Sequence, residues 1–350
     1  ALRAPPCVTL LALGRACAGA TLRARLSAPS SVSPRRFLAC PGRMAATGPD
    51  AGGTPFAPEP FDRGAFGEHL RTRSLGRRLI VHDETDSTMT RADELLRAAA
   101  ETGEDVHGAV ILAERQTGGV GRRGRAWHSD AGLNLLFSIA WCTPELQSPS
   151  RAAAIAHLIQ LNLAVPVAVA RACDEAGARG ARVKWPNDVW LGGAKVAGCL
   201  VNFDGSAAAV VGVGINVNQR FDGPAPFAAE PRAVPPTSLR EAAGAPVARE
   251  PLLADVCGAL EELMRGGMDL VLSEFEARDL LRGRLVRVHH AAREVDDPRD
   301  FEATAEGVSG EGYLRVRRAG GAGGGVLKLS GEEVSVRPAG EGMQAGEAAG

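Results

Sequence analysis

A short loop at residues 114–127 combines glycine and arginine in a way that suits anion binding. It contains, in chain order, Gly118, Gly119, Gly121, Arg122, Arg123, Gly124 and Arg125. Glycines let backbone N–H groups come close to a ligand, and the arginines surround that approach with fixed positive charge. We predict a flexible loop that holds a phosphate, a carboxylate or both, and that excludes water when it closes. A solvated basic loop is the alternative interpretation of this segment taken alone.

The same glycines have the spacing of a dinucleotide-binding GxGxxG motif, at Gly119, Gly121 and Gly124. That motif requires a helix to begin within the glycine turn. Here arginines fill two of the intervening positions, and residues 126–135 are predicted to continue as turn and strand. We therefore exclude a Rossmann fold.

Two later segments place polar residues on predicted strands. Residues 183–190 read Val-Lys-Trp-Pro-Asn-Asp-Val-Trp, and a strand that contains proline must be an edge or a bulge. Lys195 follows a Gly-Gly turn, so a hairpin would return its ammonium toward the same place, although a surface lysine fits this segment equally well. In residues 212–218, glycines within an apolar strand allow close backbone approach and Asn216 offers an amide to a phosphate, whereas a plain core strand is the alternative.

Together these segments resemble the catalytic domain of biotin protein ligases. The family pattern is Ser-Thr-Asn at a helix start, Gln-Thr-x-Gly-Arg-Gly-Arg-Arg-Gly-Arg-x-Trp, Lys-Trp-Pro-Asn-Asp, Lys-x-x-Gly-Ile-Leu and Gly-x-Gly-x-Asn-Val. In this chain the pattern stands, in the same order and spacing, as Ser87 to Met89, Gln116 to Trp127, Lys184 to Asp188, Lys195 to Leu200 and Gly212 to Val217. The resemblance covers about 79–218, is weaker over 283–337 and is absent from 1–60.

The resemblance implies a role for each matching residue. The residues expected to bind biotin and the nucleotide are Ser87, Thr88, Met89, Gln116, Gly119, Val120, Gly121, Arg122, Lys195 and Asn216. Lys195, Arg122 and Arg123 are the expected catalytic residues, and Asn216 is expected near the ATP phosphates. Two positions depart from the family: Met89 replaces an asparagine, and Val120 replaces the first arginine of the loop. Both changes bear on affinity for the reaction intermediate and on its retention.

The implied reaction uses ATP to convert the carboxylate of biotin into biotinyl-5′-AMP, which a target lysine amine then attacks. Mg²⁺, Arg122, Arg123 and Lys195 would stabilise the charge that develops at the α-phosphate. ATP, biotin and Mg²⁺ are therefore the expected substrates and cofactor, with no protein residues assigned as metal ligands. The expected partner is the biotin carboxyl-carrier domain of a carboxylase. No covalent enzyme intermediate is needed, so no nucleophilic triad is expected.

The apolar pattern predicts an α+β fold, in which a mixed β-sheet with flanking helices precedes a small SH3-like β-barrel. Strands are expected at 79–82, 109–113, 133–141, 183–191, 195–202 and 208–217, helices near 86–97, 155–173 and 252–275, and short barrel strands from 284 to 337. The expected organisation is a leader over 1–50, a linker over 51–78, a biotin- and ATP-binding catalytic domain over 79–280 and the barrel over 281–340.

Composition bears on compartment and partners. Residues 1–49 carry seven arginines and no acidic residue, which is typical of an organellar transit peptide and predicts a plastid or mitochondrial location, with the cytoplasm as an additional site. A leader without an address function is the alternative. The whole chain has a net charge of −1, so the remainder is acidic, which argues against nucleic-acid binding. The seven scattered cysteines indicate reduced thiols. No membrane association is expected. The acting species is expected to be a monomer or a homodimer.

Three other functions compete with this interpretation. A lipoate or octanoate protein ligase shares the fold and the acylation of a lysine, but the paired arginines and the Trp-Pro-Asn-Asp segment favour biotin. A biotin-binding regulator would need a DNA-binding domain, and residues 1–60 show no apolar periodicity for one. A non-catalytic biotin-binding protein is suggested by Met89 and Val120, and formation of an adenylate from ATP would exclude it.

Overall fold

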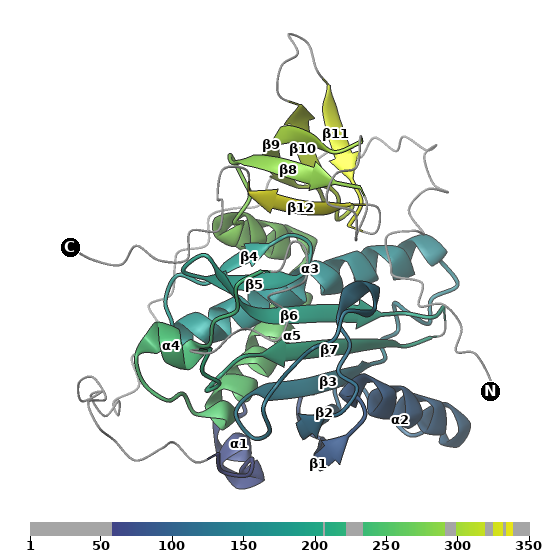
Figure 1. The fold of residues 1–350 in the computed structure, drawn as a ribbon. Coiled ribbons are helices and arrows are strands. Elements are labelled where there is room, and N and C mark those ends of the chain that lie inside the picture. The colour runs from purple at the N-terminus through teal and green to yellow at the C-terminus, as the bar shows by residue number, and fades with distance from the viewer. Residues whose placement is uncertain are drawn as a thin grey trace, which may run out of the picture.

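The computed structural model describes residues 58–205, 207–221, 234–290, 299–318, 325–331 and 334–338. These residues form two β-sheets, with helices packed on the larger one (Figure 1). The predicted leader over 1–50 lies outside the described residues. The α+β class and the mixed sheet predicted from the sequence are confirmed.

The larger sheet has seven strands, of which only one neighbouring pair is parallel. Their spatial order is β1 (Leu79–Thr85), β2 (Val110–Gln116), β3 (Leu135–Trp141), β7 (Ala209–Ile215), β6 (Ala194–Asn202), β5 (Asp188–Leu191) and β4 (Arg182–Lys184). The parallel pair β1–β2 needs a crossover, which α2 (Thr88–Thr102) provides. α2 begins after Ser87, whose side chain accepts the N–H of Met89, and ends at Gly103 in the left-handed conformation.

Alternating side chains give this sheet two different faces. Val110 and Leu112 of β2 point into the main core, whereas Ile111 points to the side of α2. The main core is closed by α3 (Arg151–Glu175) and α5 (Arg249–Arg278), which pack on each other behind the sheet (Figure 1). In β7 the same alternation sends Val211 and Val213 into the main core. The intervening Gly212 and Gly214 therefore lie on the α2 face and leave that part of the sheet uncovered, whereas Val210 at the start of β7 packs against α2.

α3 is the most apolar of the helices. Its length and composition would suffice to cross a membrane, but 56% of the apolar window is buried within the fold. Residues such as Leu158, Leu161 and Val169 are fully enclosed between the sheet and α5. The apolarity of α3 is thus explained by its place at the centre of the main core.

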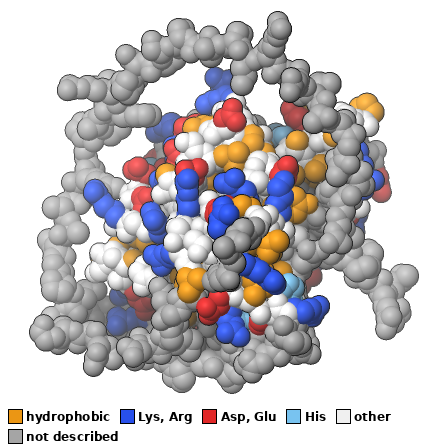
Figure 2. Space-filling model, turned by 90° about the horizontal axis from the view of Figure 1, so that it is seen from above, with side chains coloured by type: hydrophobic (Ala, Val, Ile, Leu, Met, Phe, Trp, Pro, Cys, Tyr) orange, Lys and Arg blue, Asp and Glu red, His pale blue; other side chains and the backbone are white. Residues whose placement is uncertain are grey.

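The smaller sheet is antiparallel and confirms the predicted C-terminal β domain. Its strands follow the order β11 (Val326–Leu329), β10 (Leu314–Arg318), β9 (Phe301–Val308), β8 (Leu285–His289) and β12 (Ser335–Pro338). In β10, Leu314 and Val316 are buried while Arg315 and Arg317 are exposed. Figure 2, which views the molecule from the side of this domain, accordingly shows Lys and Arg side chains spread over the surface among apolar ones.

The predicted linker over 51–78 is wrong for the residues of it that are described. Asp62 caps α1 (Arg63–His69) by accepting the N–H groups of Gly64 and Ala65. Phe66 on α1 is buried against α5, and Leu75 farther along is also fully buried. The prolines and glycines before residue 61 concealed this packed segment, which belongs to the main core.

One predicted strand is divided in two. Residues 183–191 were expected to be continuous, but β4 ends at Lys184 and β5 begins at Asp188, with a turn through Pro186 between them. Proline lacks the N–H that a ladder requires, so the chain reverses there and β4 becomes the edge of the sheet. The predicted hairpin around Gly192 and Gly193 is confirmed as the β5–β6 connection.

Candidate active site

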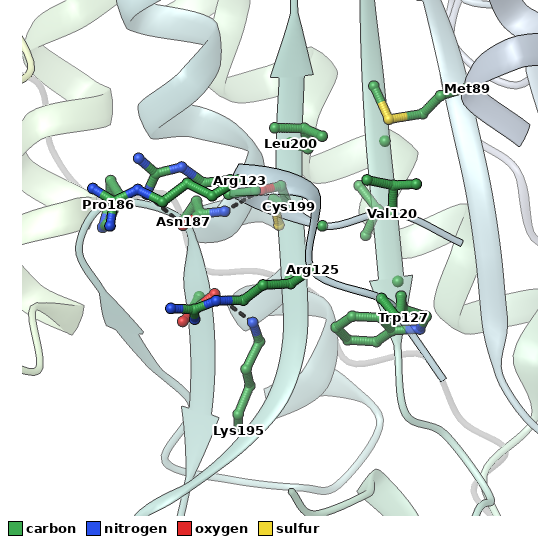
Figure 3. Close-up of a pocket in the computed structure, with 18 of the residues that line it drawn as sticks. Met89, Val120, Arg123, Arg125, Trp127, Pro186, Asn187, Lys195, Cys199 and Leu200 are labelled. Carbon is green, nitrogen blue, oxygen red and sulfur yellow. Dashed lines mark hydrogen bonds and ion pairs between the residues drawn. The ribbon is translucent and has the colours of Figure 1, made fainter. Parts of the chain in front are cut away.

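A cavity of about 200 Å³ lies on the α2 face of the larger sheet. Its walls are the start of α2, the arginine loop, the turn between β4 and β5, and β12 of the smaller sheet. The predicted site residues that line it are Ser87, Thr88, Met89, Gln116, Val120, Gly121, Arg122, Arg123 and Lys195. Met89, Val120 and Trp127 lie on one side of the cavity, with Pro186 and Asn187 on the other (Figure 3). The structure thus brings together predicted site residues that are as far apart in the sequence as Ser87 and Lys195.

The floor of the cavity depends on glycines in neighbouring strands. Gly198 of β6 and Gly214 of β7 are register partners, and the indole of Trp127 lies over both. A Cβ atom added to Gly214 would be 2.6 Å from Cε2 of Trp127, and one added to Gly212 would be 2.6 Å from Sδ of Met89. Both distances are far below van der Waals contact, so a side chain at either position would displace its neighbour, which is harder for the Trp127 indole than for the flexible Met89. The glycines noted in the sequence therefore allow two large side chains to lie flat on the sheet.

Gln116 is held by the first residue of α2. The backbone N–H and the hydroxyl of Thr88 both donate to Oε1 of Gln116, at 2.7 and 3.0 Å. The Thr88 hydroxyl also lies 2.9 Å from Oγ of Ser138 on β3. Because Oε1 accepts both bonds, the amide Nε2 is directed to the other side, where it lies 3.1 Å from the position a Cβ of Gly119 would occupy. Gly119 itself is outside the lining of the cavity and gives this amide room.

The arginine loop is a small hairpin closed by its own backbone. Gly121 N–H donates to the carbonyl of Arg125 at 2.7 Å, and Trp127 N–H donates to that of Gly119 at 2.9 Å. The tip is the 3₁₀ turn η2 (Arg122–Gly124), in which Arg123 has a φ of 59°. This left-handed conformation costs an ordinary residue about 1–2 kcal/mol. In this conformation the Arg123 side chain reaches the carbonyls of Gly331 and Val334 beside the smaller sheet.

Both predicted catalytic arginines contact backbone carbonyls of the C-terminal domain. Arg122 donates from Nη2 to the carbonyl of Gly331 at 2.5 Å and from Nη1 to Oδ1 of Asn187 at 3.3 Å. Arg123 donates from Nη2 to the carbonyls of Gly331 and Val334, at 3.2 and 3.1 Å. The two arginines therefore join the loop to the smaller sheet, and they form the cavity wall on that side. The sequence identified their charge but not these partners.

Lys195 forms the polar centre of the site. Its Nζ lies 2.7 Å from Oδ1 of Asp188 and 5.6 Å from the centroid of the Trp127 ring. Burial alone would raise the pKa of Asp188, but the positive charges of Lys195 and Lys184 outweigh it and the pKa is lowered. Asp188 is therefore ionised at neutral pH. Asn187 Nδ2 donates to the carbonyl of Cys199, which holds the β4–β5 turn against β6.

Asn216 is not among the residues that line the cavity, and its expected place near the ATP phosphates stays a prediction. Its side chain is buried, and Nδ2 donates to the carbonyl of Thr237 at 3.0 Å. The backbone of Thr237 in turn donates to the carbonyl of Lys195, and Lys195 N–H donates to that of Pro235. A buried amide must find partners, and here they lie in the segment just before α4 (Leu239–Ala243). Asn216 thus supports the backbone that carries Lys195.

Several cavity residues were not among the predicted site residues. They are Arg125, Trp127, Lys184, Asn187, Asp188 and Arg337. All but Arg337 belong to motifs quoted from the sequence, and Arg337 comes from β12, more than 140 residues away along the chain. Within the described ranges, no group of three or more His, Cys, Asp or Glu residues could hold a metal ion.

Comparisons with known proteins agree on one family. The model of the biotin/lipoate A/B protein ligase family matches residues 81–218. The biotin–[acetyl-CoA-carboxylase] ligase of Mycobacterium tuberculosis is 33% identical over 252 residues, which are 68% of this chain and 88% of that protein. The bifunctional ligase/repressor BirA of Bacillus subtilis is 32% identical over 203 residues, so this chain spans only 57% of the length of that relative.

A solved structure gives the same result. The biotin protein ligase of Aquifex aeolicus in complex with biotin and ATP aligns with a TM-score of 0.59 and 26% identity, over 75% of this chain and 99% of that one. The alignment is long enough to include more than the range of the family model. The fold described above is therefore similar to that of a solved biotin protein ligase.

Proposed function

Because the chain belongs to the biotin protein ligase family, we propose that it activates biotin with ATP and transfers it to a lysine of a biotin carboxyl-carrier domain. The observation that carries this proposal is the cavity itself. It places the ammonium of Lys195 between a glycine floor covered by Trp127 and a wall that bears Arg122. Such a site can hold an apolar ring system against the indole and bring two anionic groups to one lysine.

The first step forms a mixed anhydride. A carboxylate oxygen of biotin attacks the α-phosphorus of ATP, and pyrophosphate leaves with the electrons of the broken P–O bond. The two reactants repel each other, and Lys195 reduces that repulsion where the new bond forms. Thr88 and Gln116 form a fixed polar pair at the start of α2, where the helix N-terminus favours polar and anionic ligand groups.

The second step transfers the acyl group. The neutral amine of the acceptor lysine attacks the acyl carbon of biotinyl-5′-AMP, AMP leaves with the electrons of the broken C–O bond, and the nitrogen loses one proton to give a secondary amide. The chain needs no nucleophile of its own for this exchange. The name of the mycobacterial relative supports an acetyl-CoA carboxylase as acceptor.

Mg²⁺ in this proposal enters with ATP as the substrate complex. The cavity does not fit a resident metal ion, because Asp188 is the one carboxylate among the described residues that line it and is already paired with Lys195. Mg²⁺ is often bound mainly by substrate phosphates and water. We therefore assign no protein ligand to it and derive no step through it.

Two further expectations belong to the proposal. The arginine-rich, acid-free residues 1–49 support import into a plastid or mitochondrion. Biotin is favoured over lipoate or octanoate because the family model covers both kinds of ligase while the relatives compared above are biotin ligases by name.

The test is exchange of labelled pyrophosphate into ATP by the purified chain. We expect exchange that depends on biotin, and a loss of about 100-fold or more in Lys195→Ala, since removing a group that stabilises transition-state charge costs about that much. The exposed Lys328 on β11 offers the matched control, and Lys328→Ala should exchange at the wild-type rate. Exchange that depends on lipoate or octanoate would overturn the substrate, and full activity in Lys195→Ala would overturn the site.

A further inference from the structure

Lysine is rare in this chain, and two of its few copies line one cavity. The sequence has 40 basic residues, of which only Lys184, Lys195 and Lys328 are lysines. Lys184 and Lys195 both line the cavity, whereas Lys328 is exposed on β11. Arginine and lysine differ in one respect that matters in a buried site, because lysine can lose its charge and arginine cannot.

The position of Lys184 is fixed by the strand that carries it. Val183, its neighbour on β4, points into the main core, so the side chain of Lys184 leaves the sheet on the opposite face, where the cavity lies. The residue is only 3% exposed, and its Nζ lies 5.8 Å from the centroid of the Trp190 ring. Within the described part of the chain, this amine makes no hydrogen bond and no ion pair. The side chain lines the cavity.

The charges around Lys184 are mostly positive. Among the described residues, Arg337 on β12, Lys195 on β6 and Arg122 in the loop act on it, against one carboxylate, that of Asp188 on β5. Burial, together with the charge of Arg337, lowers the pKa of Lys184 to about 7. The empty cavity therefore disfavours the charged form of this amine.

We propose that Lys184 is a phosphate-binding residue of this cavity and that its amine takes up a proton when the nucleotide binds beside it. The proposal rests on the function proposed above, since it needs an adenylate in the cavity. A phosphate within about 4–6 Å would favour the ammonium and raise the pKa of Lys184 by about 1–3 units. The charge that completes the binding site would thus appear only when the anion is present, while the empty site avoids a further uncompensated cation.

Calorimetric titration of the full chain with biotinol-5′-AMP, an unreactive analogue of the adenylate, tests this. Measured at about pH 8 in two buffers of different ionisation enthalpy, the wild-type protein should take up about 0.8 proton per ligand bound, for a pKa that rises by about 2 units. Affinity should also fall by about 25-fold between pH 7 and 9, because binding then requires a proton that the free site no longer holds.

Variants assign the proton to Lys184. Lys184→Met removes the amine and Lys184→Arg keeps a permanent charge, so both should show no proton uptake and an affinity that is flat from about pH 7 to 9. Lys184→Met should bind the analogue at least about tenfold more weakly than wild type at pH 7. The control Lys328→Met should behave as wild type.

The outcomes separate this inference from the function on which it rests. Binding of the analogue without proton uptake by the wild-type protein would overturn the role of Lys184 and leave the ligase assignment intact. Uptake that persists in Lys184→Met would also overturn it. A wild-type protein that is folded but binds no biotinol-5′-AMP would instead overturn the proposed function.

Discussion

A buried ion pair beside the arginine loop offers a quantitative test of how the site is anchored. Oε2 of Glu114 on β2 lies 2.5 Å from Nη1 of Arg249 at the start of α5, and Oε1 lies 3.1 Å from Nη2. The side chains are 13% and 5% exposed, and Glu114 also accepts the N–H of Phe61 at 2.6 Å. Glu114 therefore joins three segments of the chain two residues before Gln116.

Glu114→Gln keeps the shape of this side chain and removes its charge. Breaking a buried ion pair costs about 3–5 kcal/mol, because the remaining charge stays buried without compensation. Arg249 retains bonds to the carbonyls of Glu59 and Asn134, at 2.6 and 3.3 Å, so we expect the lower end of that range. A loss of about 3 kcal/mol should lower the melting temperature by about 6–12 °C.

Urea unfolding followed by circular dichroism measures the loss. The matched control is the adjacent exposed pair of Arg115 and Glu84, 2.8 Å apart with side chains 58% and 52% exposed. Glu84→Gln should cost less than about 1 kcal/mol. Equal losses for Glu114→Gln and Glu84→Gln would refute the reasoning. The double change Glu114→Leu/Arg249→Met should cost less than the two single changes added together, because it leaves no unpaired charge.

Two further substitutions probe the cavity itself. Gly214→Ala should lower biotin-dependent pyrophosphate exchange by about 100-fold with the circular dichroism spectrum unchanged, because the added methyl group would lie 2.6 Å from the Trp127 indole and tilt it into the ligand space. The control is Gly67→Ala, whose added Cβ meets nothing within 4 Å. Equal activity of the two variants would contradict the glycine floor. Val120→Arg adds a cation to a loop position that is 54% exposed. It should slow dissociation of the adenylate several-fold in a chase experiment. An unchanged release rate would show that this position does not face the phosphate.

Much of the architecture could be predicted because it is encoded by local patterns. The apolar, glycine-containing stretch 208–217 predicts a strand, and the structure confirms it as β7, in which Val211 and Val213 enter the main core while Gly212 and Gly214 face the cavity. The Gly192-Gly193 pair correctly predicts the β5–β6 hairpin, since both residues adopt positive φ. A helix was also predicted to start near residue 86, and the structure places the N-cap of α2 at Ser87. Each of these features depends on neighbours close in the sequence.

The partners of the site residues could not be predicted in the same way. Arg122 and Gly331 are 209 positions apart, and only the docking of the smaller sheet brings them together. Asn216 was expected near the ATP phosphates, and its motif does not reveal that its amide donates to the carbonyl of Thr237, 21 positions away. The sequence specifies which groups can bind a ligand, and long-range packing decides which of them are already bound to the protein.

The charge state of the cavity shows most clearly how the sequence supplies the charged groups while long-range packing decides which of them are paired. The motifs supply Lys184, Lys195 and Arg122 as cations with Asp188 as an anion, but no spacing tells which of them is compensated. In the structure Asp188 pairs with Lys195 at 2.7 Å, which leaves Lys184 beside the positive charges of Arg337 and Arg122 with its own pKa lowered. A phosphate in the cavity would offset those positive charges and would favour the charged form of Lys184. A cavity assembled in this way favours the ligand that carries the missing negative charge.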